Sequence, residues 1–571
     1  MIKDKCFWLL ASIVFVSLFL FLGASYFNTK GEPREAVVAL SMLQQGNWIL
    51  PINNAVDIPY KPPLFHWCIA LGSMLTGGVS EYTSRFPSAV ALAVMVLAGY
   101  VFFARRRGWN VAFVMALLTL SNFELHRAGT NCRVDMLLSA LMVLALYQLY
   151  KWGEKGLRGI PWTGILCLSG AFLTKGPVGV VLPCLVTAVF LWMRGWNFWN
   201  ICYSFLWVGL VSCVLPFLWY WAAYQQGGER FLQLVLEENI WRFMGKMSYE
   251  SHENPAYYNV LTIMAGFLPY TLLALLSLFT LKYKKIRYPI SSCWTRFKQY
   301  ISQMDDVRLF SLVCIVIIFV FYCIPKSKRS VYLIPVYPFI AYFLAEYMLY
   351  AWRFRPMLLK AFGHMMAVLV WGLLALFAIV RLGGISDAVF AGHHATENIA
   401  FLYAMKTVPI GIVGLLLLTG IIVTTSTYFL LCRRGKFLHW GLYGIFAVIF
   451  SLYMALDGMF VPIILNVKSD KPVAQYIAEV VPEGKLYSCY TNQVTGNPMR
   501  QFSINFYLGD RVVPFEGERP TEGYLVAGEE DAAIFKEKHN GYRLELVYDS
   551  GHRSCDDHKI VCLYYFRKME R

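Results

Sequence analysis

Charged residues are scarce in this sequence. Only 15% of its 571 residues are Asp, Glu, Lys or Arg, whereas 58% are hydrophobic and the mean hydropathy is +0.50. This composition excludes a soluble enzyme and indicates an integral membrane protein. The net charge of +16 does not indicate nucleic acid as a partner, because the Lys and Arg residues lie in short loops between apolar segments.

The sequence also lacks internal repeats, low-complexity tracts and any Cys pair at the spacing of a metal site. Most of its 14 cysteines lie in apolar segments, where Cys behaves as a small hydrophobic residue. Cys555 and Cys562 lie in the polar tail, either as a disulfide or as two free thiols. The first apolar segment has no clear cleavage site for a signal peptidase, so we interpret it as a retained helix.

Apolar segments long enough to cross a membrane, or nearly so, recur along most of the chain. A span requires about 20 mostly apolar residues. The thirteen candidates lie near residues 6–24, 84–103, 109–123, 134–150, 160–174, 176–193, 202–224, 257–281, 308–324, 331–350, 361–381, 404–432 and 437–463. Every second connection is basic, which predicts a cytoplasmic N-terminus. An odd number of spans then places the tail and residues 25–80 outside the cytoplasm.

The tail from about residue 464 differs in character from the rest. It contains β-rich pieces such as YRLELVYD and KIVCLYYF, and one helix-like piece, KPVAQYIAEVV. This pattern is typical of a small α/β domain. We therefore predict a polytopic α-helical membrane domain over residues 1–463, with a juxtamembrane loop over 25–80, and a periplasmic α/β domain over 464–571.

The stretch from residue 31 to residue 67 is too polar to span a membrane. EPREAVVALSMLQQG has the pattern of an amphipathic helix that lies on the membrane surface and ends at Gly46. Its apolar face would carry Ala36, Leu40 and Leu43, and its polar face Arg34, Ser41 and Gln45. Pro62 and Pro63 then begin a second short helix, with Lys61 directly before it.

A second set of charged residues lies on the predicted outer side, many of them at the ends of apolar segments. Charges so close to the bilayer usually face a cavity or a partner. Lys and Arg at this depth indicate an anionic ligand such as a lipid phosphate, although single members of the set could simply extend to the interface. The set comprises Glu32, Arg34, Lys61, Arg85, Arg127, Arg133, Asp135, Lys175, Glu237, Glu238, Arg242, Lys326, Lys328 and Arg329.

Several short motifs occur in a fixed order along the membrane part. They are EPREA at 32–36, GNWILP at 46–51, YKPPL at 60–64, SRFPS at 84–88, RVDMLL at 133–138, LTKGPVG at 173–179, ENIWRF at 238–243, HENPAYYN at 252–259 and SKRSVYLIPVYP at 327–338. This ordered set resembles the aminoarabinose transferase family, GT-C enzymes related to protein O-mannosyltransferases. The resemblance implies that a sugar is moved from a polyprenyl phosphate to an envelope acceptor at the periplasmic face of the bacterial inner membrane. In the family the sugar is aminoarabinose and the acceptor is a lipid A phosphate.

The resemblance also implies roles for individual residues. The candidate catalytic carboxylates are Glu32 and Asp135. The donor phosphate would be held by Lys61, Arg85, Arg242, Lys326, Lys328 and Arg329. The substrate cavity would be lined by Arg34, Tyr60 and Asn239. Glu32 and Asp135 could instead be helix N-terminal charges, which suit the helix dipole.

Two departures from the family pattern bear on the chemistry. Gly31 stands where the family has an acid, and Tyr60 and Asn239 stand at positions that the family links with a metal. No metal ligand or cofactor is therefore predicted; a divalent metal is a further possibility, but Tyr and Asn are poor ligands for zinc. Loss of an acidic residue would slow transfer to a hydroxyl, which needs a general base, more than transfer to a phosphate.

Three other functions are compatible with these sequence features. The same chemistry could act on a hydroxyl of a protein or polysaccharide, as in O-mannosyltransferases. A lipid or sugar transporter would also have many spans, but transporters place polar groups at mid-membrane, whereas here they gather at one face. A non-catalytic envelope scaffold would have no need of a set of phosphate-binding cations.

Overall fold

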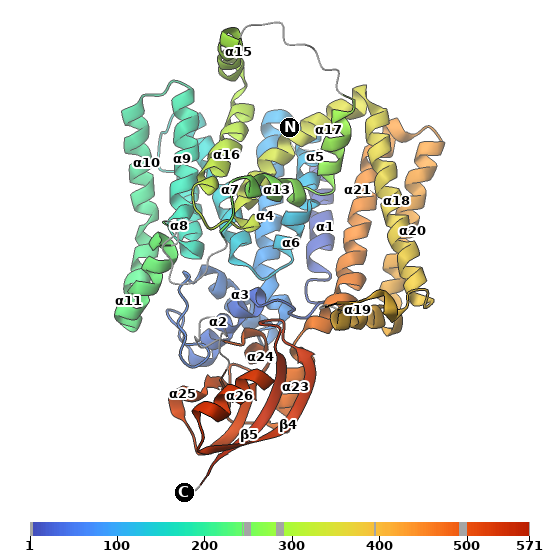
Figure 1. The fold of residues 1–571 in the computed structure, drawn as a ribbon. Coiled ribbons are helices and arrows are strands. Elements are labelled where there is room, and N and C mark those ends of the chain that lie inside the picture. Colours follow the sequence, from blue (N-terminus) through green and yellow to red (C-terminus); the bar gives the residue numbers. More distant parts are fainter. Residues whose placement is uncertain are drawn as a thin grey trace.

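The computed structural model describes residues 4–241, 244, 253–280, 290–392, 395–489 and 500–569. The chain forms a bundle of helices with a smaller sheet domain at one end, and the N-terminus lies at the opposite end of the bundle (Figure 1). The fold class expected from the sequence is therefore confirmed: a polytopic helical protein followed by an α/β domain.

A helix, or a pair of helices, occupies each of the thirteen expected positions. These are α1 (Asp4–Phe19), α4 (Glu81–Arg107), α5 (Trp109–Leu120), α7 (Val134–Glu154), α8 (Trp162–Lys175), α9 (Val178–Met193), α10 (Phe198–Ser212) with α11 (Val214–Leu236), α13 (Tyr257–Gly266) with α14 (Tyr270–Leu278), α16 (Asp306–Cys323), α17 (Tyr337–Phe354), α18 (Pro356–Arg381), α20 (Ile412–Arg433) and α21 (Phe437–Ala455). Among the described residues, eight helical segments are long and apolar enough to cross a membrane, or nine if α13 and α14, bent by 108°, form one span. The count of thirteen crossings stays a prediction.

Shorter helices connect these elements. They are α2 (Gly31–Gln45), α3 (Leu64–Thr76), α6 (Phe123–Gly129), η1 (Glu237–Trp241), α15 (Ile290–Gln303), η2 (Ser330–Val336), η3 (Asp387–Val389), α19 (Ala395–Thr407), η4 (Leu456–Phe460), α22 (Val461–Leu465) and η5 (Asn466–Lys468). The helices α2 and α3 lie between the bundle and the sheet domain (Figure 1).

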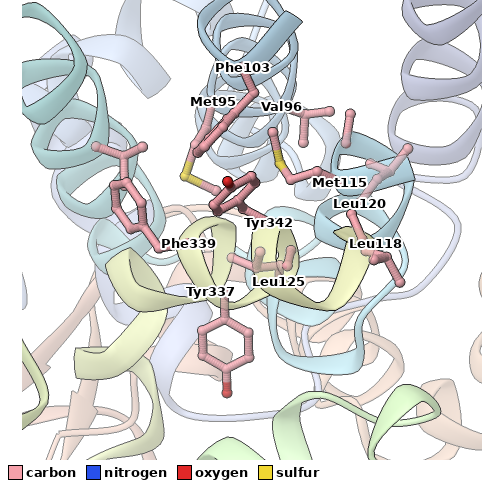
Figure 2. Close-up of a cluster of buried hydrophobic side chains, with 14 of the residues drawn as sticks. Met95, Val96, Phe103, Met115, Leu118, Leu120, Leu125, Tyr337, Phe339 and Tyr342 are labelled. Atoms are coloured by element: carbon pink, nitrogen blue, oxygen red, sulfur yellow. The ribbon is translucent and has the colours of Figure 1, made fainter. Parts of the chain in front are cut away.

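The centre of the bundle is packed with large side chains from α4, α5, α7 and α17. The rings of Phe103 and Tyr342 stack with centroids 4.7 Å apart, and Met95 and Met115 fill the space around them (Figure 2). Two-thirds of the apolar stretches of α4 and α7 are buried inside the protein, against about a fifth for α20 and α21. The central helices thus form a rigid frame for the residues at their ends, while α20 and α21 face outward.

The C-terminal domain is a five-stranded mixed sheet with strand order β2-β1-β3-β5-β4. Its elements are α23 (Lys471–Val480), β1 (Leu486–Ser488), α24 (Phe502–Tyr507), β2 (Val512–Pro514), α25 (Phe515–Glu518), β3 (Glu522–Ala527), α26 (Glu529–Lys538), β4 (Tyr542–Arg553) and β5 (Ile560–Lys568). The strands β1, β2 and β3 pair in parallel, and β5 pairs antiparallel with β3 and β4. Cys555 and Cys562 are both free thiols in this structure.

The helix α2 ends as expected, with Gly46 in the left-handed conformation (φ 65°), which glycine adopts without strain. However, it does not lie on a free membrane surface. Ser41, expected on an exposed polar face, is fully buried and donates a hydrogen bond to Asp510 of the sheet domain (2.7 Å). Ser41 was therefore assigned to the wrong environment, because the sheet domain covers it and supplies its partner, whereas Gln45 is exposed as expected.

Asp510 joins the sheet domain to the loop that precedes Lys61. Its carboxylate accepts hydrogen bonds from Ser41, from the backbone N–H of Asn54 (2.9 Å) and from the side chain of Asn505 (2.6 Å). Arg500 adds an ion pair to Asp57 in the same loop (3.0 Å). Asn54 and Asp57 of the loop are thus held by Asp510 and Arg500, which are far away in the sequence.

Replacing Asp510 with alanine is expected to loosen this loop. The substitution leaves buried donors without acceptors, at a cost of about 1–3 kcal/mol for each such group. Limited proteolysis of the full-length protein should cut residues 46–60 roughly 10-fold faster, the change that about 1.4 kcal/mol produces. Glu545→Ala, at an exposed position of β4, is the matched control. An unchanged cleavage rate in Asp510→Ala would contradict the idea that Asp510 holds this loop.

Candidate active site

A polar cleft lies where α2 and α7 begin and α8 ends, at the side of the bundle that carries the sheet domain. Its volume is about 100 Å³. Charged and aromatic side chains from separate parts of the sequence line it: Arg34, Glu35, Tyr60, Lys61, Arg133, Asp135, Lys175, Glu238, Arg329 and Tyr332. We call it the central cleft.

Lys61 is held in the central cleft by Glu35. The ammonium group forms an ion pair with Oε1 of Glu35, and the other carboxylate oxygen, Oε2, lies 3.0 Å from Nε2 of His66. Arg34 reaches the same carboxylate at 3.2 Å. Burial alone would raise the pKa of Glu35, but Lys61, His66 and Arg34 hold it well below its usual range. Glu35 is therefore anionic and orients Lys61.

A second lysine–carboxylate pair stands in the same cleft. Lys175, in the last turn of α8, forms an ion pair with Asp135, in the first turn of α7. The Lys175 ammonium also lies 4.4 Å from the centre of the Tyr332 ring, a distance suited to a cation–π contact. Gly176 follows with φ +106°, and a Cβ there would lie 2.5 Å from Oδ1 of Asn239. Only glycine permits this close approach of η1 to the turn after α8.

Glu32 and Arg85, which the sequence assigned to catalysis and to phosphate binding, are paired with each other. The guanidinium of Arg85 donates to both carboxylate oxygens of Glu32 at 2.8 and 3.0 Å, and both side chains are almost fully buried. Arg85 also donates to the carbonyl oxygens of Leu22 and Ser25 (3.0 and 2.7 Å). The pair therefore ties α2 and α4 to the segment that follows α1, and its proposed chemical roles stay predictions.

The remaining predicted residues divide into two groups. Arg34, Tyr60 and Arg329 line the central cleft. Lys328 is buried and donates to the carbonyl of Pro325 (2.6 Å), and Lys326 is exposed. Arg242 lies outside the described residues.

Five charged or aromatic residues of the cleft were assigned no role from the sequence: Glu35, Arg133, Lys175, Glu238 and Tyr332. Lys175 was noted only as a charge on the outer side. The signal for Glu35 was weak, because it is one of two acids in a short helix and its neighbour Glu32 matched the family pattern.

An apolar groove runs from the central cleft between α9, α16 and η1. It shares Lys175, Glu238 and Tyr332 with the cleft, and its other lining is mostly apolar: Pro177, Val178, Val181, Phe321, Tyr322 and Pro325, together with Asn239 and Ser327. A groove of this kind, with a cation at one end and apolar walls beyond, suits an isoprenoid chain that carries a phosphate.

The residues of the cleft do not fit a metal ion. Tyr60 and Asn239 offer neither a carboxylate nor an imidazole, and Asn239 donates its side-chain N–H to the carbonyl of Val235 (2.9 Å). Glu35 is bound by His66 and Lys61, and the carboxylate of Asp135 is paired with Lys175. Within the described ranges, no three His, Cys, Asp or Glu side chains lie together in a way that would hold a metal.

The chain is similar in sequence to several known proteins. Residues 60–221 match the sequence profile of the dolichyl-phosphate-mannose-protein mannosyltransferase family. An uncharacterized protein of Aquifex aeolicus is 26% identical over 375 residues, which cover 65% of this chain and 68% of that protein. Undecaprenyl phosphate-alpha-4-amino-4-deoxy-L-arabinose arabinosyl transferase 2 of Proteus mirabilis is 28% identical over 59% of each chain. The match to this transferase thus spans about three-fifths of its length.

A solved structure shares the fold over almost the whole chain. The crystal structure of ArnT from Cupriavidus metallidurans bound to undecaprenyl phosphate superposes with a TM-score of 0.70 at 19% identity and covers 98% of this chain and 97% of that one. The ordered motifs, the family profile and this shared fold point the same way. We conclude that the chain has the fold of ArnT and that its residues 60–221 are similar to the dolichyl-phosphate-mannose-protein mannosyltransferase family.

Proposed function

We propose that this protein transfers aminoarabinose, or a closely related sugar, from undecaprenyl phosphate to a phosphate of lipid A at the periplasmic face of the bacterial inner membrane. The observation that carries the proposal is the pair of lysines, Lys61 and Lys175, in a cleft that continues into an apolar groove. The names of the arabinosyl transferases among the relatives support the choice of sugar.

The cleft provides positive charge where the leaving group needs it. With the polyprenyl chain in the groove, the donor phosphate reaches Lys175 first, and Lys61 and Arg329 face the same small space. As the bond between the sugar C1 and the phosphate oxygen breaks, its electron pair stays on the polyprenyl phosphate. Fixed cations stabilise this developing charge without having to reorganise.

The state of the carboxylates favours an acceptor that is already ionised. Glu35 is held at low pKa by three cationic or hydrogen-bonding partners, so it is a poor proton acceptor. An oxygen of a lipid phosphate attacks C1 directly and needs no base, and a single displacement of this kind inverts the anomeric centre. The configuration of the product, read by NMR, tests that step.

A hydroxyl acceptor is the second candidate, because the family profile that matches residues 60–221 is that of a protein mannosyltransferase. In that case Asp135, which lies in the central cleft and is paired with Lys175, is the carboxylate that we propose takes the proton. Glu32 is predicted from the sequence for the same role, but it is engaged by Arg85.

Mass spectrometry of lipid A tests the proposal. Lipid A from cells that carry the gene is expected to show a species heavier by one sugar residue, absent when the gene is deleted and absent when Lys61→Ala replaces the native protein. The strains are grown under conditions where the native strain makes the protein. An unchanged spectrum in the deletion strain would then rule out lipid A as the acceptor. Glycoproteins and envelope glycans would then be compared in the same strains.

A further inference from the structure

A larger cleft lies on another side of Arg133. Its volume is about 370 Å³, and Arg133 lines both it and the central cleft. Its walls come from α1 and the segment after it, from α6 and from η4 and α22. These elements are distinct from α9, α16 and η1, which line the apolar groove. We call it the lateral cleft.

Cationic and unpartnered polar groups gather in the lateral cleft. Arg133 makes no ion pair with any described residue, and its Nε is buried without a hydrogen-bond partner. His126 is bound through Nε2 to Asp457 (2.6 Å), and its Nδ1 is also buried without a partner. Arg127 reaches the cleft from α6, although Glu124 engages it at 2.8 Å. Buried polar groups are normally satisfied, and here two unpartnered ones lie at the same cleft.

Gly31 leaves space beside the guanidinium of Arg133. A Cβ at Gly31 would lie 3.3 Å from the guanidinium nitrogen Nη2 of Arg133. An acid at this position, as in the family pattern, would stand against the guanidinium. In this chain Gly31 brings no carboxylate to that space, so the guanidinium of Arg133 interacts with the carboxylates of Glu32 and Asp135 only at longer range and lies open to both clefts.

Apolar side chains line two walls of the lateral cleft, beside polar residues such as Ser25, Asn28 and Thr130. Leu18, Phe21 and Leu22 line it from the end of α1 and the residues that follow, and Leu456, Val461 and Leu465 line it from η4 and α22. A cationic head beside an apolar wall at the end of a membrane bundle matches one kind of molecule: a lipid with a phosphate headgroup.

We propose that the lateral cleft binds the phosphorylated acceptor lipid and that Arg133 holds its phosphate at the point where the two clefts meet. This rests on the proposed function. The donor enters from the groove at Lys175 and the acceptor from the side of α1 and α22. The acceptor phosphate oxygen forms the new bond to the sugar C1 while the bond from C1 to the polyprenyl phosphate breaks. The electron pair leaves with the polyprenyl phosphate, and no proton is transferred.

Photolabelling of the full-length protein in lipid nanodiscs tests this assignment. The probe is a phosphatidic acid with a diazirine in one acyl chain, and the matched probe is a diacylglycerol with the same diazirine chain. The phosphatidic acid is expected to label peptides of α1 and α22, and Arg133→Gln is expected to lower that labelling about 10-fold, as loss of one charge-assisted hydrogen bond would do. Arg133→Lys, which keeps the charge, should retain most of it and shows that loss of labelling is not loss of folding.

Three results would overturn the proposal: equal labelling by the diacylglycerol, labelling that Arg133→Gln leaves unchanged, or labelling that excess undecaprenyl phosphate displaces. The last result would assign the cleft to the donor. Inorganic phosphate should compete only weakly if the lipid is the true ligand, whereas full displacement by it would mark a site for the free ion. Labelling does not require sugar transfer, so the two proposals can be told apart. If the lipid A spectrum does not change but the phosphatidic acid labels the cleft, lipid A is ruled out as the acceptor and the lipid-binding site is retained.

Discussion

Lys61→Met is expected to lower the rate of sugar transfer about 10²–10³-fold, the usual cost of removing one fixed group that stabilises charge in the transition state. Lys61 is the cation that Glu35 holds in the central cleft, and methionine has a similar length without the charge. The effect should appear in kcat, because the charge on the leaving phosphate increases as the bond to the sugar breaks. Single-turnover transfer by the purified protein in nanodiscs, with saturating donor, is the measurement.

Two further variants make the result specific to Lys61. Lys61→Arg keeps the charge but changes the geometry, so a partial recovery is expected. Lys155→Met removes an exposed lysine at the other end of α7 and should leave the rate unchanged. If Lys61→Met transferred sugar at the native rate while Lys155→Met did too, the phosphate-stabilising role of Lys61 would have to be abandoned.

Lys175→Met is expected to weaken donor binding rather than to slow the chemical step alone. Lys175 lines both the apolar groove and the central cleft, so it meets the phosphate as the isoprenoid chain is seated. A hydrogen bond to a charged group contributes about 1.5–3 kcal/mol, which corresponds to a rise in the donor KM of roughly 10- to 150-fold. Titration with undecaprenyl phosphate measures the affinity directly.

An Asp135 variant distinguishes phosphate binding by Lys175 from a purely structural role of the Lys175–Asp135 ion pair. If Lys175 and Asp135 acted only as an ion pair that holds α7 and α8 together, Asp135→Asn and the double variant would resemble Lys175→Met in every assay. We expect instead that Asp135→Asn keeps affinity for undecaprenyl phosphate, because the lysine remains. A double-mutant cycle on binding and on thermal unfolding quantifies the coupling, and loss of binding in Asp135→Asn equal to that in Lys175→Met would refute the assignment.

The elements of this fold could be predicted because each has a local cause. Apolar runs gave the positions of the long helices, Gly46 ended α2, and the alternating pieces of the tail became β1, β3, β4 and β5. The strand β2 was missed because three residues, Val512–Pro514, show no alternation that could be recognised. The helices α5, α8 and α9 were expected as spans, although each is shorter than a membrane usually requires.

The partners of the charged residues could not be predicted in the same way. Glu35 and Lys61 are 26 residues apart, Asp135 and Lys175 are 40 apart, and Glu32 and Arg85 are 53 apart. Each pairing depends on how two helices pack, which periodicity does not encode. The sequence therefore identified a charged face but could not distinguish Glu32, which binds Arg85, from Glu35, which binds Lys61.

The contacts between Asp510 and the loop before Lys61 also set an order of assembly during biosynthesis. Asn54 and Asp510 are 456 residues apart, so the loop leaves the ribosome long before its partner does. Every membrane helix must be inserted, and the sheet domain must reach the same side and fold, before the loop is clamped. We expect nascent chains that end before residue 500 to be embedded in the membrane but inactive. Sugar transfer would then begin only after translation has passed through the last domain, which delays consumption of the lipid-linked donor until the whole protein has matured.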